Sequence, residues 1–282
     1  MDLQLVVDKD RCIGCEECVK DCPFGLLAMK GEMPAITREN EEQCIGCQHC
    51  MAVCTTGAIS VMGLNPDESI PLPGAFPPAR QVEALIKGRR SVRRYHHRSV
   101  PKKTISFLLE TALFAPTAVN NCDVLFTVVE DVESMEEVRK KTYDALKAGI
   151  ESGSLPKGME YVEQRMAQGF DKVMEDMDLI FRGAPHLLVA SAPKDGFSPE
   201  VDCLIALSYF EVLATSMGLG TLWCGLAKAI LTLVAPEILA GLGVPASHRI
   251  GYIMAFGEPN VTYQRTIQPG KPKINWARQI VA

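Results

Sequence analysis

The seven residues Cys-Ile-Gly-Cys-Glu-Glu-Cys at positions 12–18 decide the fold of the N-terminal part of this chain. They recur as Cys-Ile-Gly-Cys-Gln-His-Cys at positions 44–50, which is 32 residues further on. After three intervening residues, each block is followed by a fourth cysteine, Cys22 or Cys54. This is an internal duplication with too few copies for a solenoid. The duplication predicts a small metal-binding domain over residues 1–62.

The spacing of these cysteines favours iron–sulfur clusters over zinc. Zinc usually binds two separated C-x2-C pairs. Three cysteines at successive gaps of two instead surround one face of a cubane, and the fourth, after a gap of three, reaches the other cluster. Gly14 and Gly46 suit the tight loop that each cluster needs. Two zinc knuckles, or cysteines that bind no metal, are the alternatives.

The composition indicates a globular protein in a reducing compartment. Of the 282 residues, 47% are hydrophobic and 22% are charged, which allows a large core. The first residues, MDLQLVVDKDRC, do not have the pattern of a signal peptide. The eleven cysteines therefore favour metal ligation in the cytoplasm over a secreted disulfide scaffold. The net charge of −5 gives no support for nucleic-acid binding.

One stretch could be mistaken for a membrane span. Between residues 203 and 227 only Glu211 is charged. A carboxylate near the centre of a span costs about 3 kcal/mol on insertion scales. Gly218-Leu219-Gly220 also interrupts the stretch and is typical of a helix end. We expect a buried helix followed by a buried strand, and no membrane span.

Charge and proline content divide the chain into three parts. Residues 1–62 carry 5 basic and 10 acidic side chains, whereas the remaining residues carry 24 of each. Residues 63–78 contain five prolines, which predicts an extended linker without helix or central strand. We therefore expect a cysteine-rich domain at 1–62, a linker at 63–79 and a body at 80–282.

Helical and strand patterns alternate in the body, which indicates an α/β or α+β fold. The expected helices span 81–88, 104–114, 134–148, 161–178 and 199–217. The expected strands span 124–129, 186–190, 219–224 and 249–256, with shorter strand-like segments at 26–29 and 58–62. The first of the body strands is expected to be buried. Cys122, Cys203 and Cys224 are expected to be buried small apolar residues.

Residues 1–62 closely resemble bacterial two-cluster ferredoxins. The resemblance implies that one [4Fe–4S] cluster is held by Cys12, Cys15, Cys18 and Cys54. It implies that the second is held by Cys22, Cys44, Cys47 and Cys50. Thr55 follows the last cysteine where the pattern has proline, a departure that removes no ligand. His49 is expected to be a bystander.

Three short segments of the body, each weak by itself, carry residue types that suit a phosphate group or a flat ring. Residues 89–94 hold four arginines and a serine, and arginine matches phosphate oxygens bidentately. The alternative for them is a solvated basic face or a nucleic-acid patch. Residues 115–121 read Ala-Pro-Thr-Ala-Val-Asn-Asn, in which small side chains let a flat ring approach the backbone. Residues 218–225 read Gly-Leu-Gly-Thr-Leu-Trp-Cys-Gly.

Together these segments resemble the nitroreductase family of flavoproteins over roughly residues 80–270. The fold implied is α+β, with a ferredoxin-type domain in front of it, and the cofactors implied are FMN and two [4Fe–4S] clusters. By matching position, the FMN phosphate and ribityl groups would be held by Arg89, Arg90, Ser91 and Arg93. The ring would be lined by Pro116, Thr117, Ala118, Asn120, Cys224 and Gly225. Arg265 would be a last phosphate-binding residue.

The resemblance implies an FMN-dependent oxidoreductase in which no side chain need act as a nucleophile. The electron donor would be a ferredoxin or NAD(P)H, and the acceptor a nitro compound, a quinone or an enone. Residues 122–124 depart from the family pattern, and no G-x-G-x-x-G opens a NAD site. The apolar helix at 199–217 predicts a homodimer with FMN at the interface. An electron carrier or flavin-storage protein, or an iron–sulfur sensor, is the alternative.

Overall fold

The computed structural model describes residues 3–160, 162, 164 and 178–277, which form two compact units. The first comprises Met1–Pro77 and Pro116–Cys122, and the second comprises Pro78–Ala115 and Asp123–Ala282. Most of the helix expected at 161–178 lies outside the described residues. Among the residues described, no helix is both long enough and apolar enough to cross a membrane.

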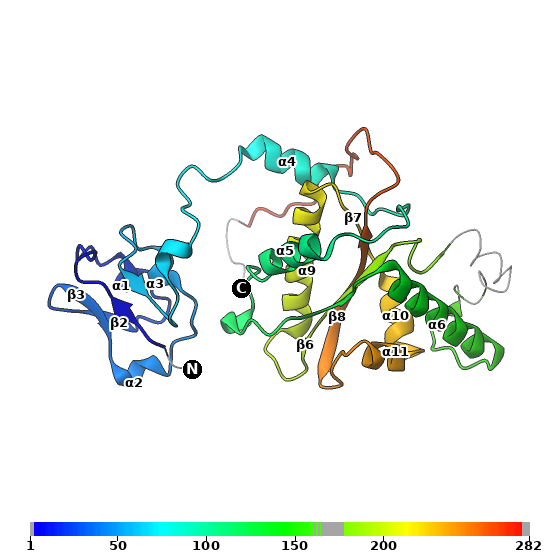
Figure 1. Ribbon diagram of the computed structural model, residues 1–282, viewed down its shortest axis with the longest axis horizontal. Coiled ribbons are helices and arrows are strands. Elements are labelled where there is room, and N and C mark those ends of the chain that lie inside the picture. Colours follow the sequence, from blue (N-terminus) through cyan, green and yellow to red (C-terminus); the bar gives the residue numbers. More distant parts are fainter. Residues whose placement is uncertain (1–2, 161, 163, 165–177, 278–282) are drawn as a thin grey trace. The chain divides into compact units, whose positions relative to one another are not determined.

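The first unit is built from short elements around the two cysteine blocks (Figure 1). Its strands are β1 (Val6–Val7), β2 (Leu27–Lys30), β3 (Met33–Ile36) and β4 (Ile59–Ser60). Its helices are α1 (Glu17–Lys20), α2 (Arg38–Glu41) and α3 (His49–Ala52), followed by the 3-10 turns η1 (Pro66–Glu68) and η2 (Ala118–Asn120). Antiparallel pairing joins β1 to β4 and β2 to β3. A small core of Cys18, Leu27 and Ile59 packs between them.

The duplication is visible in the backbone as well as in the sequence. Gly14 and Gly46 have φ of 64° and 63°, a conformation that glycine adopts without steric cost. Two residues later in each block, Glu16 and Gln48 have φ of 62° and 59°. Both loops therefore turn in the same way, and each leads directly into a short helix, α1 or α3.

The second unit contains a four-stranded antiparallel sheet in the order β5-β6-β8-β7. Its strands are β5 (Leu125–Val129), β6 (His186–Pro193), β7 (Gly220–Trp223) and β8 (His248–Gly257). Its helices are α4 (Ala79–Gly88), α5 (Lys102–Ala112), α6 (Val132–Glu151), α9 (Pro199–Ser216), α10 (Gly225–Leu233) and α11 (Pro236–Gly241). The antiparallel pairing confirms α+β over a parallel α/β body.

Helices cover both faces of this sheet (Figure 1). Side chains alternate between the faces along each strand. On β6, Leu187 and Val189 join one core with α6, α10 and α11. Leu188 and Ala190 join the other core with α5 and α9. The expected pair of a long apolar helix and a strand after it is confirmed as α9 and β7, and Gly218 between them has φ 77°.

Three expectations are wrong in detail. The proline-rich segment contains the 3-10 turn η1, because Asn65 Oδ1 accepts a hydrogen bond from Asp67 N at 3.1 Å and caps it. Strand β5 is half-buried for most of its length, because it lies at the edge of the sheet. Cys122 is exposed, whereas Cys203 and Cys224 are buried as expected. Cys122 lies in a loop and has φ 52°.

Candidate functional site

Each set of four cysteines surrounds its own cavity in the first unit. One cavity has about 340 Å³ free of protein atoms, and the cysteines in its lining are Cys12, Cys15, Cys18 and Cys54. The other has about 410 Å³, and its cysteines are Cys22, Cys44, Cys47 and Cys50. Each cavity thus takes three cysteines from one block and the fourth from the other block. This is the grouping that the ferredoxin resemblance implies.

Each cavity presents four cysteines, the number of ligands that a four-iron cubane takes. Within the described part of the chain, no three His, Cys, Asp or Glu side chains come together closely enough to hold one metal ion. A four-iron cubane is larger than one ion and takes four separated thiolates. His49 lies on the first turn of α3 with its Nδ1 3.2 Å from Asp21 Oδ2, so a carboxylate engages that nitrogen.

Backbone N–H groups already point at two of the thiols. Leu26 N donates to Cys22 Sγ at 3.3 Å, and Ala58 N donates to Cys54 Sγ at 3.2 Å. Burial acts to raise the pKa of Cys54, but the bonds from Ala58 and Thr56 outweigh it and lower that pKa. Burial raises the pKa of Cys50 to about 11. Hydrogen bonds to sulfur are one means by which proteins tune iron–sulfur clusters.

In the second unit, the arginine run follows α4 and crosses the start of β7. Ser91 forms a parallel bridge with Thr221, and Val92 N donates to Thr221 O at 2.9 Å. A Cβ on Gly220 would approach Val92 to within 2.6 Å, so glycine is required there. Two of the sequence segments, residues 89–94 and 218–225, are therefore neighbours in space.

A buried carboxylate lies beneath the first arginine of the run. Glu211 on α9 has 9% of its side chain exposed, and its Oε1 lies 3.3 Å from Arg89 Nη1. Thr221 Oγ1 donates to the same oxygen at 2.9 Å. The Arg90 guanidinium lies over the Tyr263 ring, 6.0 Å from its centroid. Arg89 and Arg90 are thus fixed by side chains that lie far from them in the sequence.

The third cavity brings Arg93, Cys224 and Gly225 together. It has about 710 Å³ free of protein atoms. Its other lining residues are Leu179, Ile180, Arg182, Leu222, Trp223 and Leu226. A Cβ on Gly225 would lie 2.8 Å from the Tyr252 hydroxyl, so this backbone position stays bare. Burial raises the pKa of the Cys224 thiol to about 12, which keeps it protonated and unreactive at neutral pH.

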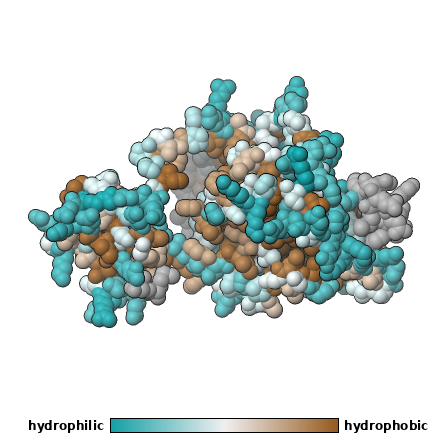
Figure 2. Space-filling view, viewed as in Figure 1, coloured by the Kyte–Doolittle hydropathy of each residue, from teal (hydrophilic) through white to brown (hydrophobic). Residues whose placement is uncertain are grey.

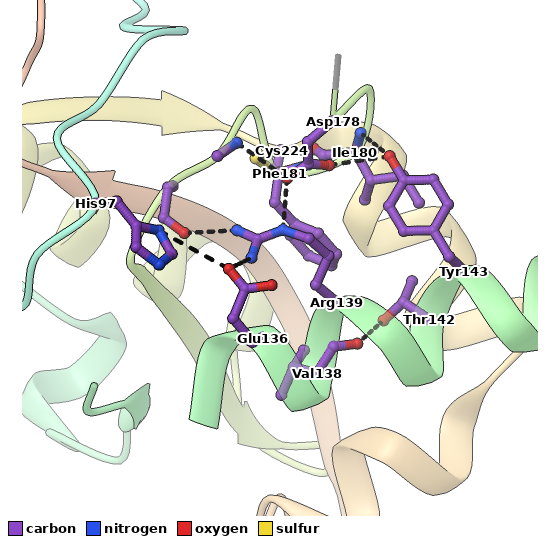
Figure 3. A network of polar contacts seen from close by, with 12 residues as sticks. His97, Glu136, Val138, Arg139, Thr142, Tyr143, Asp178, Ile180, Phe181 and Cys224 are labelled. Atoms are coloured by element: carbon purple, nitrogen blue, oxygen red, sulfur yellow. Dashed lines mark hydrogen bonds and ion pairs between the residues drawn. The ribbon is translucent and has the colours of Figure 1, made fainter. Parts of the chain in front are cut away.

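A buried ion pair supports one wall of this cavity (Figure 3). Arg139 on α6 donates through Nε to Asp178 Oδ2 at 2.8 Å, and both side chains are about nine-tenths buried. The Tyr143 hydroxyl donates to Asp178 Oδ1 at 2.9 Å. The backbone N–H groups of Phe181 and Gly183 donate to the same carboxylate, each at 2.9 Å. This network holds the segment that carries Leu179, Ile180 and Arg182.

The remaining candidate residues belong to other segments of the chain. Pro116, Thr117, Ala118 and Asn120 belong by contact to the first unit, where Asn120 Nδ2 donates to Ile45 O at 3.0 Å. Arg265 is exposed in the tail after β8, outside any helix or strand. Of the predicted FMN residues, the structure therefore places Arg93, Cys224 and Gly225 in one cavity and the arginine run beside it.

Sequence reasoning missed Glu211, Asp178, Arg139 and Arg182 as parts of this site. Glu211 carried a signal, because a lone carboxylate in an apolar run needs a buried partner. Arg139 and Asp178 are 39 residues apart, and no local pattern predicts their contact. Arg182 lies just after a stretch whose pattern indicated only a charged helix.

Comparison with known proteins matches a protein family to each of the two parts of the chain. Residues 5–61 match the 4Fe-4S dicluster domain, and residues 86–258 match the nitroreductase family. A protein from Methanothermobacter thermautotrophicus, named as an NADH dehydrogenase/NAD(P)H nitroreductase, is 39% identical over 57 residues. That match spans 20% of this chain and 30% of that protein.

Solved structures show the same fold in the larger unit. A nitroreductase with bound FMN from Bacteroides fragilis is 23% identical, with a TM-score of 0.55 over 69% of this chain and 98% of that one. Another with bound FMN, from Desulfitobacterium hafniense, is 24% identical, with a TM-score of 0.54 over 70% and 98%. The family match covers more than half of the residues, and it agrees with the arginine run and the cavity beside it. The chain belongs to the nitroreductase family and carries an N-terminal 4Fe-4S dicluster domain.

Proposed function

We propose that this protein is an FMN-dependent oxidoreductase that moves electrons between two [4Fe–4S] clusters and a small organic acceptor. The observation that carries the proposal is the pairing, in one chain, of two four-cysteine cavities with a separate cavity lined by Arg93, Cys224 and Gly225. Arginine suits the FMN phosphate, and a bare glycine backbone suits a flat ring. The donor set therefore fits the cofactor found in the structural neighbours.

Each of the three parts of the sequence would have its own role. Residues 1–62 would hold the clusters, residues 63–79 would link them to the body, and residues 80–282 would bind FMN. The phosphate and ribityl groups would contact Arg89, Arg90, Ser91, Arg93 and Arg265. The ring would contact Pro116, Thr117, Ala118, Asn120, Cys224 and Gly225. Eight cysteines that would serve as cluster ligands favour a reducing, cytoplasmic setting.

The reaction joins one-electron and two-electron chemistry. Each cluster, when bound, carries single electrons, and FMN, when bound, exchanges them for a hydride equivalent. A nitro group takes two electrons and two protons to give a nitroso group and water, and a quinone takes the same to give a hydroquinone. A ferredoxin or NAD(P)H would supply the electrons. The chain's own part is to hold the cofactor, orient the acceptor and exclude water.

Cofactor content and turnover test this function together. Protein purified without oxygen should hold about eight iron and eight acid-labile sulfide per chain, and acid should release FMN from it. After anaerobic reduction, adding nitrobenzene or benzoquinone should reoxidise the flavin. Stoichiometric zinc without sulfide would contradict the cluster assignment. Bound flavin that neither acceptor reoxidises would instead indicate an electron carrier or flavin-storage protein.

We propose that two chains form a homodimer through α4, α5 and α9. The inner face of α9 packs on the sheet, but its outer face and the neighbouring helices leave large apolar side chains exposed. They are Val82, Ile86, Phe107, Val201, Leu204, Tyr209 and Val212. Figure 2 shows hydrophobic residues at the surface of this unit among hydrophilic ones. An apolar helix face needs cover, and a second copy supplies an identical apolar face.

Sedimentation at micromolar concentration tests the dimer. We expect a species of twice the 30.8 kDa chain mass that carries FMN. Glutamate at both Leu204 and Val212 should give monomers that lose flavin, because charge would be buried at the interface. The matched control is Leu233→Glu, which changes an exposed leucine at the end of α10, on the other face of the sheet. A wild-type monomer that keeps FMN and turns over would overturn the shared interface.

A further inference from the structure

The cavity that holds Arg93 contains a second arginine that no FMN motif includes. Arg182 comes from the segment between Asp178 and β6, and it lines the cavity beside Leu179 and Ile180. Arg93, Cys224 and Gly225 come from the segments that resemble FMN-binding motifs. The two arginines therefore reach one cavity from separate parts of the fold.

The backbone of Arg182 is held in a conformation that favours glycine. Its φ is 60°, which is uncommon for a residue with a side chain and costs about 1 kcal/mol. Its N–H donates to Asp178 O at 3.0 Å, and the N–H groups on both sides of it bind the Asp178 carboxylate. Strained residues that the surroundings fix in place cluster at functional sites. The buried Arg139–Asp178 pair thus fixes the backbone position of Arg182.

No acidic side chain among the described lining residues balances the positive charge in this cavity. Among the described residues that line it, Arg93 and Arg182 are the charged ones, and most of the other lining side chains are apolar. Within the described part of the chain, neither guanidinium forms an ion pair with a carboxylate. Burial and the Asp178 carboxylate raise the pKa of the Cys224 thiol, whereas Arg182 and Arg93 lower it. A cavity with two cations and apolar walls suits an organic anion.

We infer that Arg182 binds the carboxylate of the acceptor, so that the protein prefers flat aromatic or unsaturated acids over neutral acceptors. Arg93 belongs to the proposed FMN set, which leaves Arg182 for the second molecule that must enter the cavity. Its planar guanidinium matches a carboxylate with two parallel hydrogen bonds. Leu179, Ile180 and Leu226 would contact the apolar body of that acid. This inference rests on the proposed function, because it concerns the same cavity.

A pair of acceptors that differ in charge tests the inference on the FMN-loaded protein. The probes are 4-nitrobenzoate and 4-nitrobenzyl alcohol, mixed anaerobically with reduced protein while flavin reoxidation is followed. In Arg182→Gln, the apparent Kd for nitrobenzoate should rise about 10- to 100-fold, because charge-assisted hydrogen bonds are lost. The values for the alcohol should stay within about twofold. Arg182→Lys should recover part of the affinity for the acid.

A binding measurement gives a readout without turnover. Titration of the oxidised holoprotein with benzoate, followed calorimetrically, should show binding that Arg182→Gln weakens by the same factor. Benzamide, the neutral analogue, should bind equally to both proteins. The matched control is Arg38→Gln, an exposed arginine on α2, outside the larger unit.

The outcomes separate this inference from the proposed function. If neither acceptor reoxidises the flavin, the proposed function fails. If both acceptors reoxidise the flavin and Arg182→Gln changes their apparent Kd values equally, Arg182 does not bind the acid. The proposed oxidoreductase function is then unaffected. If Arg182→Gln instead releases FMN, the arginine serves the cofactor and the inference is overturned.

Discussion

Replacing both Arg89 and Arg93 by alanine is expected to release FMN while the iron content stays unchanged. Charge-assisted hydrogen bonds to a phosphate contribute about 1.5–3 kcal/mol each, so FMN affinity should fall about 100-fold or more. Fluorescence titration of flavin-free protein with FMN measures the affinity, and iron analysis of the same sample reports on the clusters. Unchanged FMN affinity would show that the phosphate binds elsewhere.

The ion pair between Arg89 and Glu211 means that removing Arg89 affects stability as well as FMN binding. Removing Arg89 leaves the buried Glu211 carboxylate without its cation, which destabilises the fold independently of FMN. The double change Arg89→Ala with Glu211→Gln removes that charge and keeps a partner for Thr221. This variant should melt close to the wild type and still bind FMN weakly. Arg94→Ala is the matched control, since Arg94 is an exposed member of the same run that lies outside the proposed set.

The cysteine repeat could be predicted because its information is local. Ligand spacing and the 32-residue period lie within short stretches, and the structure brings the same four-cysteine groups to each cavity. The long helix α9 and the strands β6 and β8 were predicted for a similar reason. Apolar patterns in these segments are long, so their boundaries agree with the structure to within a few residues.

Elements with little pattern of their own were missed. Strands β1 and β3 have two and four residues, and they exist because a partner strand pairs with them. Helix α10 contains an apolar run that begins directly after β7, and the sequence offers no turn residue except Gly225 to separate them. Short elements depend on tertiary contacts, which a sequence pattern does not contain.

Some residues of the candidate site could likewise be predicted from the sequence, and others could not. The arginine run and the Cys224-Gly225 pair lie in motifs, and both could be found from residue type and order. The support of the cavity wall could not, because it depends on the meeting of α6 with the segment after residue 177. Arg139 and Tyr143 on α6 and the Asp178 carboxylate together position Arg182, and no spacing rule joins α6 to residue 178.

Breaking this network should have the largest effect on stability of any single change considered. Asp178→Leu removes the acceptor for Arg139 Nε, for the Tyr143 hydroxyl and for two backbone N–H groups. Removing one partner of a buried ion pair costs about 3–5 kcal/mol, because the other charge is left uncompensated. For a unit of this size that lowers Tm by about 6–20 °C. Thermal melts followed by circular dichroism measure it.

A double change shows whether the charge or the backbone capping matters more. Where an ion pair is isolated, replacing both partners by apolar residues is often neutral. Here Arg139→Met with Asp178→Leu should remain far less stable than the wild type, because the N–H groups of Phe181 and Gly183 still lose their acceptor. Asp144→Asn is the control, since its ion pair with Lys140 on the same helix is exposed and should contribute about 0–1 kcal/mol. Full recovery in the double variant would mean that Asp178 acts only as a counter-ion, and that it does not hold the Arg182 segment in place.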